Sequence, residues 1–123
     1  MSTRWPLHLA IASLSLAAGL PAAGAGDAAR GKDLYETDCT VCHSVDRNKV
    51  GPAHKGVFGR KAGSAPGYSY SAAVASSGVV WNEETLARWL TDPEKFIPGQ
   101  KMGVSVPDAK EREDLVAYLK TLR

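Results

Sequence analysis

The sequence predicts an all-α fold with three to four main helices and long loops. Three segments carry apolar residues at helical spacing, and each follows a residue that can cap a helix. No segment alternates apolar and polar residues as a half-buried strand does, and the sequence contains no internal repeat. Twelve glycines and seven prolines among 123 residues indicate that the segments between the helices are irregular.

The N-terminal segment has the order of a secretory signal peptide. A basic residue precedes an apolar, alanine-rich run over about 7–20, and an A-x-A cleavage site follows at 23–25. The run is short and contains two serines and a histidine, which disfavours a permanent transmembrane helix, with a retained anchor as the alternative. We therefore expect a signal peptide over 1–25, a mature domain over 26–123 and a periplasmic location, without stable membrane insertion after cleavage.

The mature domain is nearly neutral. Removing Arg4 with the signal peptide leaves 14 basic and 13 acidic side chains, so we expect no nucleic-acid partner. A chain of this size can bury a core, but only a modest one. A covalently held apolar cofactor would enlarge that core and order the long loops.

The first helix is expected from about Ala28 to Asp38, with Asp27 as its cap. Gly31, Leu34 and Tyr35 lie on one stripe of this helix, which runs straight into the only two cysteines of the chain.

Residues 44–68 contain many turn-forming glycines and prolines and should be irregular. A loop of this length inside a small domain is usually functional or wrapped around something. A short helix over 72–76 is expected next, closed by Gly78.

Two further helices follow. Asn82 caps the segment EETLARWL, which Asp92-Pro93 should end. Asp108 and Glu111 have capping-box spacing at the start of the last helix. The apolar stripes of these two helices comprise Leu86, Trp89 and Leu90, and Leu115, Tyr118, Leu119 and Leu122.

Cys39, Cys42 and His43 form a C-x-x-C-H motif. A disulfide is possible in an oxidising compartment. A thioredoxin-like pair would need a βαβ setting, for which strands are missing, and zinc would lack a complete ligand set. Attachment of a c-type haem explains the motif best, because the two thiols bond to the haem vinyl groups and the following histidine binds the iron.

The iron then needs a sixth ligand, and Met102 is the only methionine of the mature chain. A lone methionine is more often a core residue. Its place in the loop IPGQKMG, away from any amphipathic stripe, favours ligation, and a thioether ligand raises the reduction potential. His43 and Met102 are therefore the candidate ligands of the iron of one covalently bound haem c.

Five stretches occur in the order typical of one family: GKDLYETDCTVCHSV, VGPAHKGVFGRKAG, APGYSYS, VVWNEETLARWLTDPEKFIPGQKM and EREDLVAYLK. The sequence resembles the class I c-type cytochromes over essentially all of residues 27–123. The loop between His43 and Gly51 is shorter than in mitochondrial relatives, and one residue is missing after Met102, which suggests a compact bacterial monohaem form. The resemblance implies the cytochrome c fold, with helices and loops wrapped around the haem.

The resemblance also implies roles for individual residues. Cys39 and Cys42 match the thioether anchors, His43 the proximal ligand and Met102 the distal one. Pro52 matches a proline whose carbonyl orients the proximal imidazole.

Other matches concern the haem propionates and the packing of the helices. Arg60, Tyr70 and Trp81 match residues that bind the propionates, with Tyr68 as the alternative to Tyr70. A solvated charge is the alternative for Arg60, and ordinary core packing for Trp81. The residues matched to the crossing of the first and last helices are Gly31, Tyr35, Leu115 and Tyr118.

Four residues near the haem depart from the family pattern. Trp89 stands where a tyrosine usually reaches the methionine sulfur, and Val74 where an asparagine often holds a water, so we expect a more labile or differently poised bond between Met102 and the iron. Gln100 replaces a common threonine. His54 replaces a leucine, and it would compete for the iron or lie partly exposed, tuning the potential with pH.

These features predict a soluble electron carrier rather than an enzyme, because both axial positions of the iron are filled. Its partners would be redox proteins with acidic docking surfaces, and a monomer is expected. The basic residues expected around the haem crevice are Arg47, Lys49, Lys55, Lys61, Lys95 and Lys101. The alternatives are the haem-bearing subunit of a periplasmic dehydrogenase, or a haem protein that reduces peroxide or binds gases.

Overall fold

A computed structural model of the chain describes residues 1, 2, 19 and 26–123, so the signal peptide expected over 1–25 lies outside the described residues apart from three isolated positions. Five helices form in the rest of the chain. They are α1 (Ala28–Asp38), α2 (Ala72–Ala75), α3 (Glu83–Thr91), α4 (Pro93–Phe96) and α5 (Ala109–Leu119). Residues 26–123 contain no strand beyond one isolated bridge between Lys61 and Val80, which agrees with the expected all-α fold.

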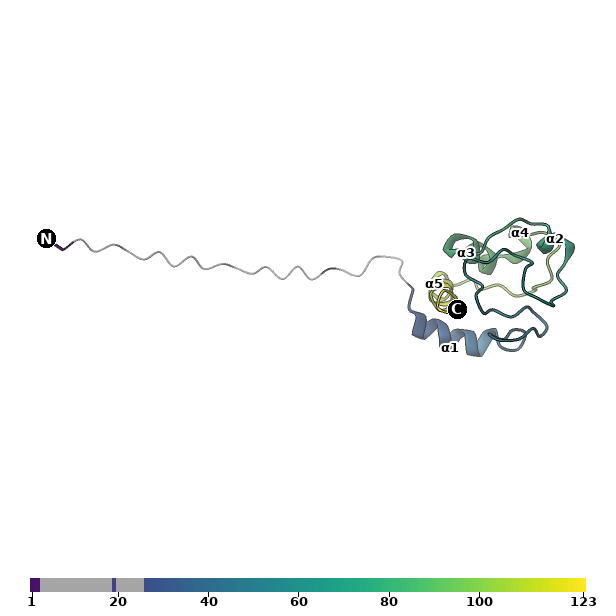
Figure 1. The fold of residues 1–123 in the computed structure, drawn as a ribbon, viewed down its shortest axis with the longest axis horizontal. Helices are drawn as coiled ribbons and strands as arrows, with labels where there is room; N and C mark the ends of the chain where they lie inside the picture. Colours follow the sequence, from purple (N-terminus) through teal and green to yellow (C-terminus); the bar gives the residue numbers. More distant parts are fainter. Residues whose placement is uncertain (3–18, 20–25) are drawn as a thin grey trace.

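Helices α1 and α5 pack against each other, and Figure 1 shows α5 end-on where it crosses α1. Gly31 of α1 lies directly against the α5 backbone. A Cβ atom at Gly31 would lie 1.9 Å from the carbonyl oxygen of Asp114, so no other residue fits without moving a helix. Tyr35 and Leu115 are buried beside this contact, as the family resemblance implied.

Asp114 is the only fully buried charged side chain among the described residues, and the sequence did not reveal it. Its carboxylate accepts hydrogen bonds from the Asp27 backbone N–H at 2.7 Å and from Lys110 Nζ at 2.9 Å. Burial by itself raises the pKa of Asp114, but these two bonds and the charges of Lys110 and Arg30 outweigh burial and hold the pKa below its usual range. The carboxylate therefore ties the start of α1 to α5.

The helix starts follow the predicted caps. Asp27, Asn82 and Asp108 each accept a hydrogen bond from a backbone N–H in the first turn of the helix that follows. Ser71 does the same for α2, although no cap was predicted for that helix. Asp92-Pro93 does end α3, but the same two residues also start α4, with Asp92 as its cap and proline in its first turn. The short helix α4 was not predicted.

The long connection from α1 to α2 is irregular, as expected, and folds back on itself. Asn48 joins two parts of it, because its side chain accepts from the Ala53 N–H and donates to the Pro66 carbonyl, both at 2.9 Å. Gly63, with a φ of 81°, adopts a conformation that favours glycine. None of the helices within the described residues is long and apolar enough to span a bilayer.

Candidate functional site

A cavity of about 330 Å³ lies between the helices and the long loop. Its lining is mainly apolar and includes Leu86 and Leu90 of α3 and Leu115 and Leu119 of α5. The structure brings all nine of the predicted site residues to this cavity. They are Cys39, Cys42, His43, Pro52, Arg60, Tyr70, Trp81, Trp89 and Met102.

The two cysteines lie on one tight turn at the end of α1. Cys39 caps the helix, and its carbonyl accepts from the N–H groups of Cys42 at 3.2 Å and His43 at 2.8 Å. Both cysteines are free thiols, which leaves the disulfide alternative unsupported. Burial, followed by the nearby Asp38 and Cys42, raises the pKa of Cys39 to about 11, so this thiol is protonated at neutral pH.

His43 is oriented by its neighbours in the loop. Its Nδ1 lies 2.9 Å from the Pro52 carbonyl oxygen, and because that oxygen can only accept, Nδ1 carries the proton and Nε2 keeps its lone pair. A Cβ at Gly51 would lie within 2.7 Å of three ring atoms, so glycine is needed beside the ring. Burial lowers the pKa of His43, despite the bond to Pro52. The neutral ring with its proton on Nδ1 is the tautomer of a histidine that binds a metal through Nε2.

His54 lies against the face of the His43 ring. The two ring centroids are 4.1 Å apart and the planes are inclined by 20°, so the rings stack. Two stacked rings on the same side cannot bind one iron from opposite faces, which argues against His54 as a partner ligand to His43. Burial, then the neighbouring His43 and Arg60, lowers the pKa of His54 to about 3, so it does not titrate near neutral pH.

Arg60 carries the clearest polar signal in the cavity. Its Nη1 and Nη2 atoms donate to the carbonyls of Lys55 at 3.0 Å and Ala53 at 2.9 Å, whereas its buried Nε atom has no partner. A buried N–H without an acceptor is costly and indicates a missing anionic or polar group.

The two nearby tyrosines differ in how their hydroxyls are used. The Tyr68 hydroxyl donates to the Val50 carbonyl at 2.7 Å. The Tyr70 hydroxyl accepts from the Ala65 N–H at 3.0 Å, which leaves its own proton available to another group in the cavity. This difference favours Tyr70 over Tyr68 as the residue that binds a cavity ligand.

Trp81 and Trp89 meet edge to face on the cavity wall, with ring centroids 5.4 Å apart. Trp81 is buried, as both the ligand-binding and the core-packing interpretations require. Val74 is also buried in the cavity wall.

Met102 is held by α4. The Glu94 carboxylate of this helix accepts from the Gly99 N–H and from the Gln100 side-chain amide, both at 3.0 Å. Lys101 Nζ donates to the Ser69 carbonyl at 3.3 Å. The unpredicted helix therefore fixes the loop that carries the half-buried Met102 to the cavity.

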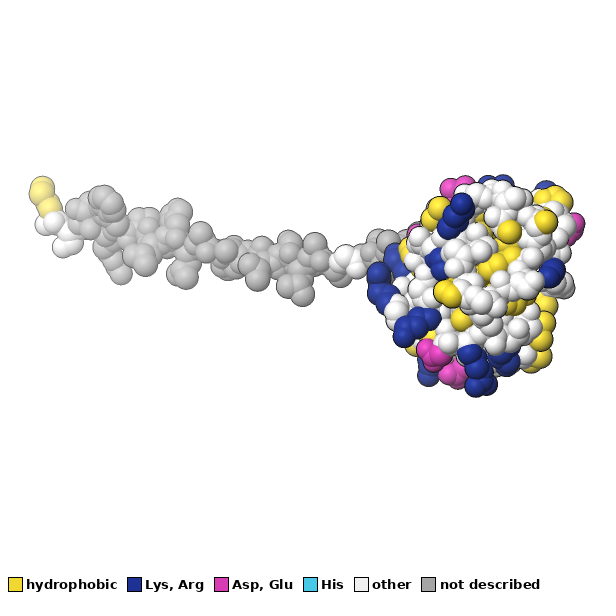
Figure 2. Space-filling view, turned by 45° about the vertical axis from the view of Figure 1, so that its right-hand side comes forward, with side chains coloured by type: hydrophobic (Ala, Val, Ile, Leu, Met, Phe, Trp, Pro, Cys, Tyr) yellow, Lys and Arg dark blue, Asp and Glu magenta, His cyan; other side chains and the backbone are white. Residues whose placement is uncertain are grey.

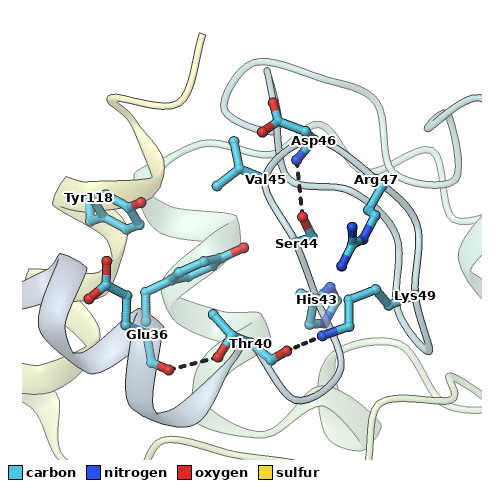
Figure 3. Close-up of a pocket in the computed structure, with 10 residues that line it drawn as sticks. Glu36, Thr40, His43, Ser44, Val45, Asp46, Arg47, Lys49 and Tyr118 are labelled. Atoms are coloured by element: carbon cyan, nitrogen blue, oxygen red, sulfur yellow. Dashed lines mark hydrogen bonds between the residues drawn. The ribbon is translucent and has the colours of Figure 1, made fainter.

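A second, more open pocket lies on the outer side of His43 (Figure 3). Arg47 and Lys49 lie on one side of it and Glu36 and Tyr118 on the other. The Lys49 ammonium donates to the Thr40 carbonyl. This pocket gives solvent a route toward the outside of the His43 ring.

The donor set and the cavity together fit a c-type haem. Two free thiols, one histidine with its Nε2 lone pair and one thioether line an apolar cavity, and the unpartnered Arg60 Nε suits a carboxylate. Among the described residues, no three His, Cys, Asp or Glu side chains cluster as a zinc site requires.

Comparison with known proteins also indicates a protein that binds a c-type haem. The family model described as cytochrome c matches residues 28–123. The chain is 46% identical over 101 residues to cytochrome c2 of Rhodopila globiformis, covering 80% of this chain and 95% of that protein. It is 48% identical over 99 residues to cytochrome c of Gibberella zeae, covering 77% and 93%.

Among solved structures, cytochrome cH from Methylobacterium extorquens matches with a TM-score of 0.75 and 46% identity, over 78% of this chain and 99% of that one. Proteins of this family carry one covalently bound haem c and transfer electrons rather than catalyse a reaction on a substrate. This chain belongs to the cytochrome c family and is a monohaem electron carrier.

Proposed function

We propose that the chain transfers single electrons between redox proteins outside the cytoplasm through an iron ligated by His43 and Met102. The observation that carries the ligand set is the hydrogen bond from His43 Nδ1 to Pro52, which reserves Nε2 for a metal, together with Met102 on the wall of the same cavity. When bound, the haem supplies a one-electron couple between ferric and ferrous iron. Cys39 and Cys42 anchor the haem as thioethers.

The polar residues of the cavity hold the haem propionates. Arg60 Nε has no acceptor, and the Tyr70 hydroxyl accepts from the Ala65 N–H and keeps its own proton for another group. Both residues line the cavity together with Trp81. Pairing the propionate charges with these donors inside the protein limits structural reorganisation when the iron changes its oxidation state. Trp89 packs against Trp81 and lacks the hydroxyl that would reach the sulfur of Met102. The bond between Met102 and the iron is therefore more labile or differently poised than in relatives with a tyrosine at this position.

The test is the visible absorption spectrum of the mature protein in both oxidation states, followed by addition of cyanide. His43 and Met102 as ligands predict a low-spin spectrum, the weak long-wavelength sulfur-to-iron band in the ferric state, and slow cyanide binding. Met102→Ala should abolish the band, whereas Val104→Ala, in the same loop and also on the cavity wall, should retain it. If the band is missing from the unaltered protein, the ligand set is refuted and a peroxide-reducing or gas-binding protein becomes the better interpretation.

The protein is exported through cleavage before Gly26. The structure of the domain supports this site, because the Asp27 N–H is already bonded to Asp114 and α1 begins at Ala28. Cleavage before Gly26 therefore keeps Asp27 and α1 in the mature chain. Mass spectrometry of a periplasmic extract should find a haem-bearing chain that begins at Gly26, and a chain that keeps residues 1–25 would contradict the proposal.

The protein is a monomer, and its redox partners dock acidic surfaces on the basic residues around its haem crevice. All six basic residues expected near the crevice are exposed, and Lys101 lies on the cavity wall. On the face shown in Figure 2, Lys and Arg side chains lie mostly around the margin, with apolar side chains between them. Association with an acidic redox partner should slow as ionic strength rises, and a rate independent of salt would refute the proposal.

A further inference from the structure

We propose that His54, held by Tyr35, is a positioning residue that braces the proximal imidazole of His43 and lowers the reduction potential of the haem. This inference rests on the proposal that His43 is the proximal ligand. It concerns a residue of this chain for which the family resemblance gives no role, because a leucine is usual at this position.

The backbone holds the two histidines side by side. The His54 N–H donates to the carbonyl of Ser44, the residue after His43, at 3.0 Å, and the Lys55 N–H donates to the Val45 carbonyl at 2.8 Å. These two bonds pair the segment after His43 with the segment that carries His54. The stacked arrangement, with 4.1 Å between ring centroids, therefore rests on a fixed frame rather than on a mobile loop.

Tyr35 fixes the His54 ring within this frame. Its hydroxyl lies 3.0 Å from His54 Nδ1, and Tyr35 itself is only 2% exposed in the contact between α1 and α5. The hydroxyl has no other hydrogen bond among the described residues, so it donates to the ring nitrogen. The Tyr118 ring packs on Tyr35 with centroids 5.2 Å apart and completes the support.

The His43 ring is thus held at its edge and on one face. Pro52 accepts from Nδ1 at the edge, and the His54 ring covers the face. A leucine at position 54 would fill similar space but would offer neither a flat ring nor a polar group. Because a polar neighbour stabilises the more positively charged ferric state, the neutral imidazole of His54 should lower the reduction potential relative to leucine.

The test compares four holoprotein variants by reduction potential and by the proton NMR shifts of the haem methyl groups in the ferric state, which depend on the plane of the axial imidazole. His54→Leu should favour the ferrous state about three- to tenfold, a rise of about 30 to 60 mV at 59 mV per tenfold change, and should reorder the methyl shifts. His54→Phe keeps a stacked ring but not the hydrogen bond, and Tyr35→Phe removes the bond from the other side. Tyr35→Phe leaves the imidazole in place and should raise the potential less than His54→Leu does. His54→Phe removes the polar group and should raise the potential about as much as His54→Leu does, but it should change the methyl shifts less.

Tyr118→Phe is the matched control, since Tyr118 packs on Tyr35 and its hydroxyl makes no hydrogen bond to His54 among the described residues. It should keep the potential and the methyl shifts of the unaltered protein. The brace is refuted if His54→Leu leaves both readouts unchanged, or if Tyr118→Phe changes them as much as Tyr35→Phe. The variants are compared only in protein that shows the sulfur-to-iron band. Absence of the band would refute the ligand set of the proposed function, and this outcome is distinct from failure of the brace.

Discussion

Replacing Glu94 by alanine should make the iron easier to reach, because this side chain holds the loop that carries Met102. The Glu94 carboxylate accepts two hydrogen bonds from that loop, from the Gly99 N–H and from the Gln100 amide. Glu94 is exposed, so each bond contributes at the lower end of the usual range, about 0.5 to 1 kcal/mol. The loop should therefore lose about 1 to 2 kcal/mol of its closed-state stability, which raises the open fraction about 5- to 30-fold.

Cyanide binding to the ferric protein measures this open fraction, because cyanide must replace the Met102 sulfur. The rate followed by stopped-flow absorption should rise by the same factor in Glu94→Ala, and less in Glu94→Gln, which can still accept one bond. Glu84→Ala is the matched control, since Glu84 is an exposed carboxylate in α3 outside this loop. A Glu94→Ala rate within twofold of both the unaltered protein and Glu84→Ala would show that α4 does not hold the ligand loop.

Three further substitutions test the frame around the site. Gly31→Ala should lower the free energy of unfolding of the holoprotein by about 2 kcal/mol, measured with guanidinium. Overpacking against a backbone carbonyl costs about 1 to 3 kcal/mol, and the better helix propensity of alanine offsets at most about 1 kcal/mol. An equal or higher unfolding midpoint would contradict this. Asp114→Asn should lower stability at pH 7 by about 1.5 to 3 kcal/mol. Because the folded pKa of Asp114 lies below the unfolded value of about 3.9, this deficit should shrink as pH falls below about 4, and a deficit independent of pH from 7 to 3 would refute the assignment. Asn48→Ala removes the bonds to Ala53 and Pro66 and should cost about 1 to 2 kcal/mol, measured against Asn82→Ala, which loses a helix cap of comparable worth but leaves the long loop untouched.

The helix boundaries could be predicted from the sequence because their signals are local. Asp27, Asn82 and Asp108 each stand directly before the helix that they cap, so the residues and their effect lie within one turn. The one missed helix, α4, shows the limit of this rule. Asp92-Pro93 was interpreted only as a stop, although a capping residue followed by proline is also a helix start.

Residue types and spacing predicted four of the residues at the cavity, and the family resemblance implied the other five. The four are Cys39, Cys42, His43 and Met102, and the structure gathers all nine residues at the cavity. What the sequence could not give were contacts between distant segments. The buried Asp114 depends on Asp27, which is 87 residues away, and looks like one more polar residue of an amphipathic helix. The stack of His54 on His43 depends on backbone pairing across an irregular loop, for which no residue pattern is diagnostic.

The cavity and the hydrophobic core are the same region of this protein. Leu86 and Leu90 of α3 and Leu115 and Leu119 of α5 are buried core residues, and all four also line the cavity. A domain of this size buries only a modest core. An empty cavity at the centre of that core removes packing contacts and lowers the stability of the fold. The haem that fills the cavity makes those contacts only in the folded chain, so filling the cavity and folding are coupled. Covalent attachment of the haem makes this stabilisation independent of the concentration of free haem.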